Sequence, residues 1–134
     1  MYLIDTSAWI AHFSSSYPFR LSDICSPDEH YICLPVYQEI LQGIRDDAQF
    51  TRIQHILDAS QWVGSPLKHT TFQSAAQLYR TARRQGLTVR SSTDCLIAAL
   101  GLEHNLTILH HDRDYEQLAG ISLLQQRCIM LHHQ

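Results

Sequence analysis

Short apolar segments that alternate with helical patterns are the feature that most limits how this chain can fold. Residues 1–4, 30–34 and 106–110 are short and largely apolar, as buried strands are, and shorter strands are expected at 61–63 and 121–124. The spacing of apolar residues predicts helices at 8–13, 19–25, 35–43, 48–59, 72–86, 91–104 and 112–118. Strands that alternate with helices are typical of βαβ units, in which helices cover both faces of a parallel sheet. We therefore predict an α/β fold with three layers and a mainly parallel central sheet.

Length and charge limit the classes of protein to which the chain can belong. Its 134 residues suit one domain, 45% of them are hydrophobic, and no linker or repeat divides residues 1–134. The net charge of −3 gives no general attraction to nucleic acid or to an anionic membrane, so such a partner would need a local basic patch. No apolar run approaches the roughly 20 residues that cross a bilayer, and no signal peptide is evident. We expect a soluble, cytoplasmic protein without a membrane partner.

Cysteine and histidine are numerous enough to need an explanation. The four cysteines contain no C-x-x-C pair, so the sequence predicts neither a zinc site nor a disulfide framework. The adjacent histidines at 110–111 and 132–133 would point to opposite faces of a strand, which is poor geometry for binding one metal ion. We therefore expect reduced cysteines and no histidine-based metal centre.

Acidic residues gather at one edge of the predicted sheet. Asp5 follows the first strand directly, Asp112 lies just beyond the strand that ends at residue 110, and Glu39 and Asp94 lie near the starts of two helices. Ligands of parallel sheets bind beyond the carboxyl ends of the strands. Clustered carboxylates repel one another unless a cation neutralises them, and an oxygen-only ligand set suits Mg²⁺ or Mn²⁺. The pattern favours a divalent-metal site.

Each of these acids also has a purely structural explanation. Asp5 and Asp112 are suited to cap the helices that follow them. Ser91 and Asp94 have the spacing of a capping box, in which the carboxylate binds back to the first residue. Glu39 lies at the edge of an apolar helix face, where a side chain can simply be solvated.

Four short motifs follow one another along the chain, at residues 2–7, 36–43, 92–99 and 109–115. Taken together, they resemble the motifs of the PIN-domain nucleases. Residues 2–7 (YLIDTS) look like the opening of that family, and V-x-x-E-x-x-x-G at 36–43 is similar to its second motif. Residues 92–99 (STDCLIAA) and 109–115 (LHHDRDY) look like the third and fourth motifs. The order and spacing cover the whole chain, and the nearest likeness is to the VapC-like toxins of type II toxin–antitoxin systems. Tyr115 stands where the family more often has Phe, a difference that we expect to matter little.

The resemblance implies a metal-dependent endoribonuclease with a PIN-like fold. Asp5, Glu39, Asp94 and Asp112 would hold Mg²⁺ or Mn²⁺, and the metal would activate water for attack on RNA. Asp114 is a second acid beside Asp112, and Asp112 is preferred because it is nearer to the end of the strand. The resemblance also implies a cognate antitoxin protein and a homodimer.

An RNA backbone needs cationic contacts, which the net charge does not supply. Nine of the ten basic residues are Arg, the better phosphate ligand, although genome composition explains this bias equally well. A charged helix face is also often merely solvated. Trp9, Tyr37 and Tyr79 are candidates for stacking on bases, although core packing is favoured for Trp9 and Tyr79. The candidate contacts to phosphate or water are Thr6, Thr93, Arg80, Arg84, Arg90 and Arg113.

Other functions fit the sequence less well. A phosphoacceptor receiver domain needs a lysine late in the chain, but the single lysine is Lys68. An aspartyl phosphotransferase usually has a second acid at the position of Ser7, and no nucleotide-binding glycine loop is present. A catalytically silent PIN-like protein that binds RNA or serves as a scaffold remains the non-enzymatic alternative. It would be expected to lack one of the acids, and none is lacking here.

Overall fold

A parallel sheet organises the computed structural model, which describes residues 1–129. Its five strands lie in the order β3-β2-β1-β4-β5, and each pairs in parallel with its neighbours. The central strand β1 is buried, with Leu3 paired to Tyr31 on one side and to Ile108 on the other. The predicted α/β class and mainly parallel sheet are therefore confirmed. The strands are β1 (Tyr2–Ile4), β2 (His30–Ile32), β3 (Gln61–Trp62), β4 (Thr107–His110) and β5 (Gln126–Cys128).

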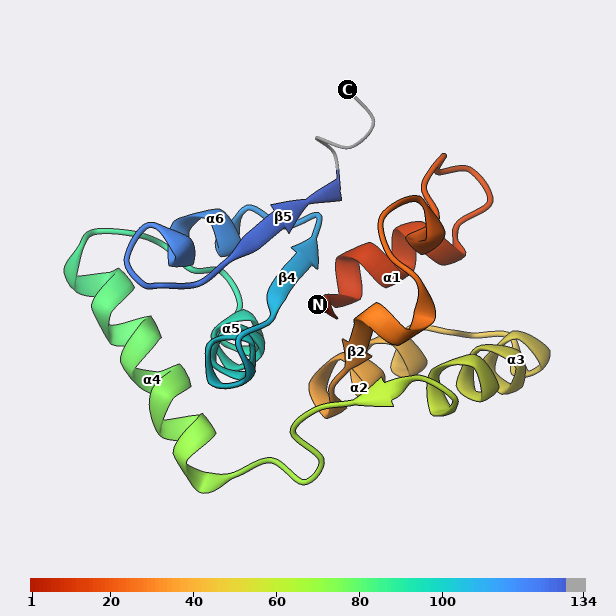
Figure 1. The fold of residues 1–134 in the computed structure, drawn as a ribbon, viewed down its shortest axis with the longest axis horizontal. Coiled ribbons are helices and arrows are strands. Elements are labelled where there is room, and N and C mark those ends of the chain that lie inside the picture. The colour runs from red at the N-terminus through yellow and green to blue at the C-terminus, as the bar shows by residue number, and fades with distance from the viewer. Residues whose placement is uncertain (130–134) are drawn as a thin grey trace.

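Helices flank this sheet, and α4 packs along α5 while α1 packs against α2 (Figure 1). Two short 3₁₀ turns, η1 (Leu21–Asp23) and η2 (Pro27–Glu29), precede β2. None of the helices between residues 1 and 129 combines the length and apolar character needed to cross a bilayer. The helices are α1 (Thr6–Phe13), α2 (Leu34–Gln42), α3 (Asp47–Asp58), α4 (His69–Arg84), α5 (Ser92–His104) and α6 (Asp114–Ala119).

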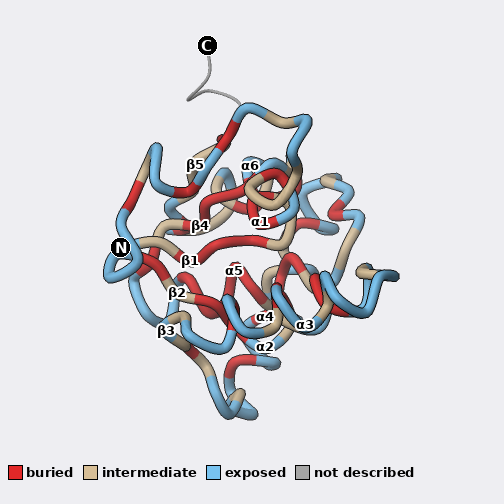
Figure 2. Tube along the Cα trace, turned by 90° about the vertical axis from the view of Figure 1, so that its right-hand side faces the viewer, coloured by how far each residue is buried: buried red, intermediate tan, exposed pale blue. Residues whose placement is uncertain are grey.

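Helix α5 forms the buried centre of the molecule together with β1 (Figure 2). Residues Ile97 to Gly101 of this helix are all buried, so it lacks the polar face of a surface helix. A Cβ atom on Gly101 would lie 2.7 Å from Ile108 Cδ1, which shows how closely α5 approaches β4. The helix ends at Asn105, whose φ of 55° is the left-handed cap that the sequence predicts. This packing holds the C-terminal end of α5 against β4.

Three predicted segments differ from the structure. The strand expected at 121–124 is wrong, because Ser122 Oγ donates to Leu118 O and accepts from Leu124 N, so a turn closes α6. The last strand begins later, at Gln126. Leu34, expected in the second strand, begins α2 instead, and the helix expected at 19–25 contains only the short turn η1.

The face of α4 that packs on the core carries smaller side chains than the spacing of its aromatic residues predicts. Trp9 is buried as expected, but Tyr79 is 38% exposed, so the prediction of core packing for Tyr79 is wrong. Phe72 is 51% exposed, and α4 instead turns the small residues Ala75 and Ala82 toward the core. Small side chains allow α4 to lie close to α5, and the large aromatic rings of α4 remain at the surface.

Candidate functional site

The carboxyl ends of β1 and β4 are joined where the sequence predicts the site. The backbone N–H of Asp5 donates to Leu109 O over 2.9 Å, which extends the pairing of the two strands by one residue. One step further, Ser7 Oγ accepts a 2.8 Å hydrogen bond from the backbone N–H of His111. These bonds bring the loop after β4 over the start of α1.

Asp5 is a buried carboxylate with a donor on each oxygen. Its Oδ2 accepts from the backbone N–H of Ser7 at 3.0 Å and from Ser7 Oγ at 2.5 Å, so Asp5 caps α1 as the structural alternative predicts. Its Oδ1 accepts a 2.6 Å hydrogen bond from Tyr115 Oη. Each carboxylate oxygen can accept more than one bond, so capping leaves Asp5 able to bind a cation as well.

Asp94 lies in the first turn of α5 and is only 6% exposed. Ser91 makes no side-chain cap bond, so the capping-box explanation of Asp94 is wrong. Its Oδ1 lies 3.3 Å from Tyr115 Oη, and its buried Oδ2 has no hydrogen-bond partner in the part of the chain that the structure describes. Burial above all, the neighbouring carboxyl group of Asp112 and the charge of Asp5 raise the pKa of Asp94 to about 9. The carboxyl group therefore keeps its proton at neutral pH unless a cation replaces it.

Asp112 and Asp114 both join this cluster, although the sequence favours Asp112. Asp112 Oδ1 accepts from the backbone N–H of Asp114 at 2.9 Å and so caps α6. Asp114 Oδ2 accepts from the backbone N–H groups of Arg90 and Ser91 at 3.0 and 3.3 Å. Among residues 1–129 its buried Oδ1 has no hydrogen-bond partner, and Arg90 Nε lies 3.7 Å from it. Asp114 is therefore as much a part of the acidic cluster as Asp112.

The arrangement of these oxygens fits a divalent cation. Asp94, Asp112 and Asp114 each offer one oxygen, and the three atoms lie within 4.8 Å of one another. Among the described residues, two buried oxygens, Asp94 Oδ2 and Asp114 Oδ1, have no hydrogen-bond donor, although Arg90 Nε lies 3.7 Å from the second. A buried acceptor left without a hydrogen bond costs about 1–3 kcal/mol. A cation would satisfy both, and an all-carboxylate set suits Mg²⁺ or Mn²⁺.

Glu39 lies beside this cluster but is not one of its three members. Thr6 Oγ1 donates a 2.8 Å hydrogen bond to Glu39 Oε1, which ties α1 to α2 immediately after Asp5. Glu39 is half-buried, so its carboxylate is more accessible than that of Asp5 or Asp94. Of the four predicted acids, Asp94 and Asp112 meet directly, Asp5 is linked through Tyr115, and Glu39 is linked through Thr6.

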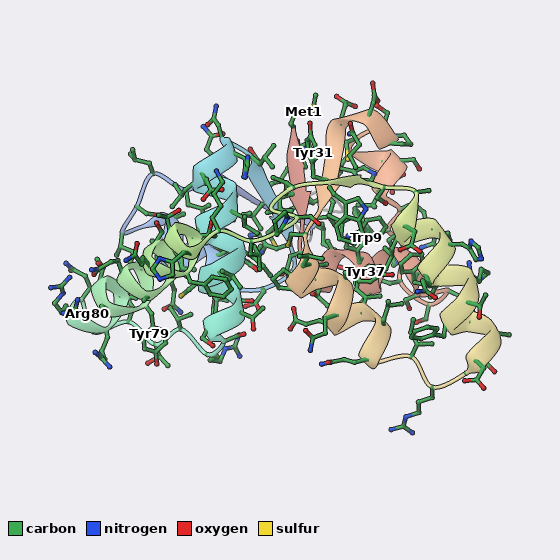
Figure 3. The ribbon with its side chains drawn as sticks, turned by 90° about the horizontal axis from the view of Figure 1, so that it is seen from below. Met1, Trp9, Tyr31, Tyr37, Tyr79 and Arg80 are labelled. Atoms are coloured by element: carbon green, nitrogen blue, oxygen red, sulfur yellow. The ribbon has the colours of Figure 1, made fainter. Side chains whose placement is uncertain are left out.

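Four of the six predicted phosphate contacts fall into two groups, and Thr6 instead binds Glu39. Arg90 lies 3.7 Å from both Asp112 and Asp114, and Arg113 is exposed where α6 begins. Arg80 and Thr93 both line a groove of about 470 Å³ between α4 and α5. Arg84 is exposed near the end of α4 and does not line that groove. Figure 3 shows Arg80 and Tyr79 on α4, on the opposite side of the molecule from Tyr37.

Three residues that hold the acids in place were not predicted. Ser7, two residues after Asp5, has the spacing of a local Asx-type turn, which was a usable signal. His110 Nδ1 accepts from the backbone N–H of Asp112 at 3.0 Å, and Nε2 therefore donates to Gln126 Oε1 at 2.6 Å. The Tyr115 hydroxyl, which we expected to matter little, is bonded to Asp5. The contacts of His110 and Tyr115 depend on the tertiary fold.

Comparison with known proteins gives one family for most of the chain. The family described as PIN domain matches residues 2–121. The chain is 38% identical over 134 residues to VapC ribonuclease Mb1587 of Mycobacterium bovis and, by the same figures, to ribonuclease VapC11 of Mycobacterium tuberculosis. Each match covers 93% of this chain and 96% of the relative.

Solved structures with the same fold share less of the sequence. VapBC-1 from nontypeable Haemophilus influenzae gives a TM-score of 0.73 at 18% identity, over 96% of this chain and 98% of that one. VapBC-5 from Mycobacterium tuberculosis, a toxin–antitoxin system, gives a TM-score of 0.71 at 20% identity, over 93% of this chain and 95% of that one. FitAB bound to a DNA fragment gives a TM-score of 0.71 at 15% identity, over 96% of this chain and 94% of that one. These likenesses concern the fold.

Proposed function

This chain belongs to the PIN domain family, and on that premise we propose that it is a metal-dependent endoribonuclease that serves as the toxin of a type II toxin–antitoxin module. One observation carries the proposal: within the described part of the chain, buried oxygens of Asp94 and Asp114 lie without hydrogen-bond donors next to Asp112. A structural cluster would satisfy these atoms internally, whereas a catalytic metal site leaves them for the ion. The assignment includes Asp5 and Glu39, which Tyr115 and Thr6 attach to the same cluster.

The chain's own residues provide a rigid set of ligands. Ser7 and Tyr115 fix the two oxygens of Asp5, and Thr6 fixes one oxygen of Glu39. The backbone N–H groups of Arg90 and Ser91 hold one oxygen of Asp114, which leaves the other for the ion. Mg²⁺ or Mn²⁺, when bound, supplies charge stabilisation at the phosphate and lowers the pKa of water at the site. Rigid ligands of this kind reduce the reorganisation that catalysis requires.

Basic side chains at two places are proposed to bind the RNA backbone. Arg90 is 62% exposed at its side chain, so the guanidinium contacts the acids and still reaches solvent. Arg113 lies on the same side, at the start of α6. The groove between α4 and α5 adds Arg80 and Thr93, the residue before Asp94. Arginine suits this role because its planar donors match phosphate oxygens.

The partners are proposed from the relatives. The neighbouring structures are VapBC and FitAB complexes, so we propose a cognate antitoxin protein and a homodimer for this chain as well. A cytoplasmic location fits an RNA substrate. It also fits the cysteines at 25, 33, 95 and 128, which are all unpaired, since reducing compartments keep thiols free.

The test is cleavage of RNA by the purified protein with Mg²⁺ or Mn²⁺, compared with the same reaction in EDTA. Asp94→Asn should abolish cleavage, whereas Asp28→Asn, at an exposed acid of η2, should leave it unchanged. Undiminished cleavage by Asp94→Asn would remove the proposed mechanism. A wild-type protein that binds RNA but cleaves none under any of these conditions would favour the silent PIN-like scaffold.

A further inference from the structure

Tyr115 places a hydroxyl group between two buried carboxylates. Its side chain is fully buried, and Oη lies 2.6 Å from Asp5 Oδ1 and 3.3 Å from Asp94 Oδ1. A phenol has one hydrogen to donate, and the shorter distance assigns that hydrogen to Asp5. The Asp5 bond is therefore a hydrogen bond to a charged acceptor, a kind stronger than one between neutral groups.

The position of the Tyr115 ring is fixed from its other side. The ring lies against the imidazole of His110, with ring centroids 4.9 Å apart. That imidazole is itself held by the backbone N–H of Asp112 and by Gln126 of β5. The hydroxyl cannot leave Asp5 without disturbing these contacts. Burial and the charges of Asp5 and Asp94 raise the pKa of Tyr115 well above its ordinary value, so the hydroxyl remains a donor.

We propose that Tyr115 is a positioning residue that holds Asp5 in place as a ligand of the divalent cation. The inference rests on the proposed function, since it concerns the same metal site. Ser7 restrains only Oδ2 of Asp5, and the hydrogen bond to Oδ1 that the described residues provide comes from Tyr115. The hydroxyl restrains Oδ1 and compensates its charge, so that Asp5 stays beside Asp94 in place of turning away. A Phe ring would fill the same space but would leave Oδ1 buried without a donor.

Calorimetric titration with Mn²⁺ and with Mg²⁺ tests this proposal without reference to cleavage. Tyr115→Phe should raise the dissociation constant about ten-fold, the lower end of the effect of losing a group that orients a metal ligand. Tyr37→Phe is the matched control, because the Tyr37 hydroxyl also donates to a carboxylate, Asp58 Oδ1 at 2.7 Å, away from the site. Its dissociation constant should equal that of the wild type.

A double-mutant cycle separates positioning from a general loss of stability. In an Asp5→Asn background, Tyr115→Phe should change the dissociation constant by less than about two-fold, because the oriented ligand is already absent. Thermal unfolding of the metal-free variants establishes that each is folded before titration. An unchanged or tighter Mn²⁺ affinity for Tyr115→Phe, or a ten-fold loss that persists without Asp5, would overturn the positioning role. If the wild type bound neither ion, the proposed function itself would fail.

Discussion

Two regions next to α1 contain buried titratable side chains, and the two regions differ in charge. One is a group of acids that repel one another when ionised, and the other contains histidines that burial keeps neutral. The carboxylate cluster (Asp5, Asp94, Asp112 and Asp114) lies beyond the ends of β1 and β4. The histidine layer (Trp9, His12, Phe13 and His30) lies where α1 meets β2. In that layer the Trp9 ring stacks on Phe13 at 5.6 Å and meets His12 and His30 edge-on at 5.9 and 5.7 Å.

The difference between the two regions lies in charge. Burial lowers the pKa of both His12 and His30, so each ring is neutral at pH 7. Neutral rings are stabilised by aromatic contacts even though Trp9 Nε1 and His30 Nδ1 lack hydrogen-bond partners. The carboxylates have no such neutral packing, because their ionised forms repel at short range. Buried polar atoms without hydrogen-bond partners therefore occur in both regions. The feature that distinguishes the candidate metal site is a group of acidic side chains close enough to repel one another.

The largest effect is expected from Asp114→Asn, which changes one atom of the cluster. The N–H groups of Arg90 and Ser91 will select the amide oxygen, so the NH₂ group will occupy the place of the unpartnered Oδ1. A donor would then face the cation, and the affinity for Mn²⁺ should fall by more than about 100-fold, beyond the usual loss for a residue that only orients a ligand.

Calorimetric titration measures this affinity. His30→Gln, in the histidine layer, should bind Mn²⁺ as the wild type does. Equal affinities for wild type and Asp114→Asn would place the cation away from Asp114 and would leave the sequence-based preference for Asp112 standing.

Metal removal should reveal the next largest effect. A cation at 100 times its dissociation constant adds about 2.7 kcal/mol to the free energy of unfolding, provided that the unfolded chain does not bind it. Because only the carboxylate cluster needs the ion, His30→Gln should gain the same increment even if its starting stability is lower. Urea unfolding with Mn²⁺ and with EDTA gives the two values. A metal increment that shrinks in His30→Gln would mean that the two regions are coupled.

The pH dependence of stability should have opposite signs in the two regions. His12 and His30 have pKa values below 6.5 in the folded protein, so the unfolded chain binds protons first as pH falls. Their contribution to stability is therefore lost as pH falls through 6.5. Asp94, with a pKa of about 9, keeps a proton that the unfolded chain releases near pH 4, so metal-free protein loses stability as pH rises toward 9. Each titrating group contributes about 1.4 kcal/mol per pH unit at most.

Urea unfolding at pH 5.5 to 8.5, with and without Mn²⁺, measures both slopes. The loss above pH 7 should disappear when the ion is bound, because the ion replaces the proton of Asp94. The loss below pH 6.5 should remain. A fall above pH 7 that persists with saturating Mn²⁺ would show that Asp94 is not a ligand.

The sequence predicted the elements whose local signals agree with their packing. The apolar β1 with Asp5 after it, and α5 with Asp94 at its start and Asn105 at its end, are found as expected. The sequence does not predict strand β5 because Gln126 to Cys128 do not form an apolar run. These residues form a strand because they pair with β4. The apolar residues before them are drawn into a turn by Ser122.

The arrangement of the candidate site could be predicted only in part, for the same reason. The acids that directly follow strands or begin helices could be identified from spacing alone. Asp114 could not be ranked, because the two N–H groups that hold it come from the loop before α5, more than twenty residues earlier. The role of Tyr115 likewise depends on a contact with Asp5, which lies 110 residues earlier in the sequence. Contacts between distant segments decide these assignments, and no local pattern records them.

The smallest effect is expected at the border of the carboxylate cluster, where Thr6 binds Glu39. Thr6→Val keeps the shape of the side chain and removes the 2.8 Å hydrogen bond to Glu39 Oε1. Because Glu39 is half-buried, water replaces part of the lost bond, and the affinity for Mn²⁺ should fall about three-fold, at the low end of the value of one hydrogen bond. Thr51→Val, at an exposed threonine of α3 that donates to a backbone oxygen, is the control and should have no effect. A Thr6→Val protein with wild-type affinity would place Glu39 outside the metal site, and the charge to be neutralised would then be confined to Asp5, Asp94, Asp112 and Asp114.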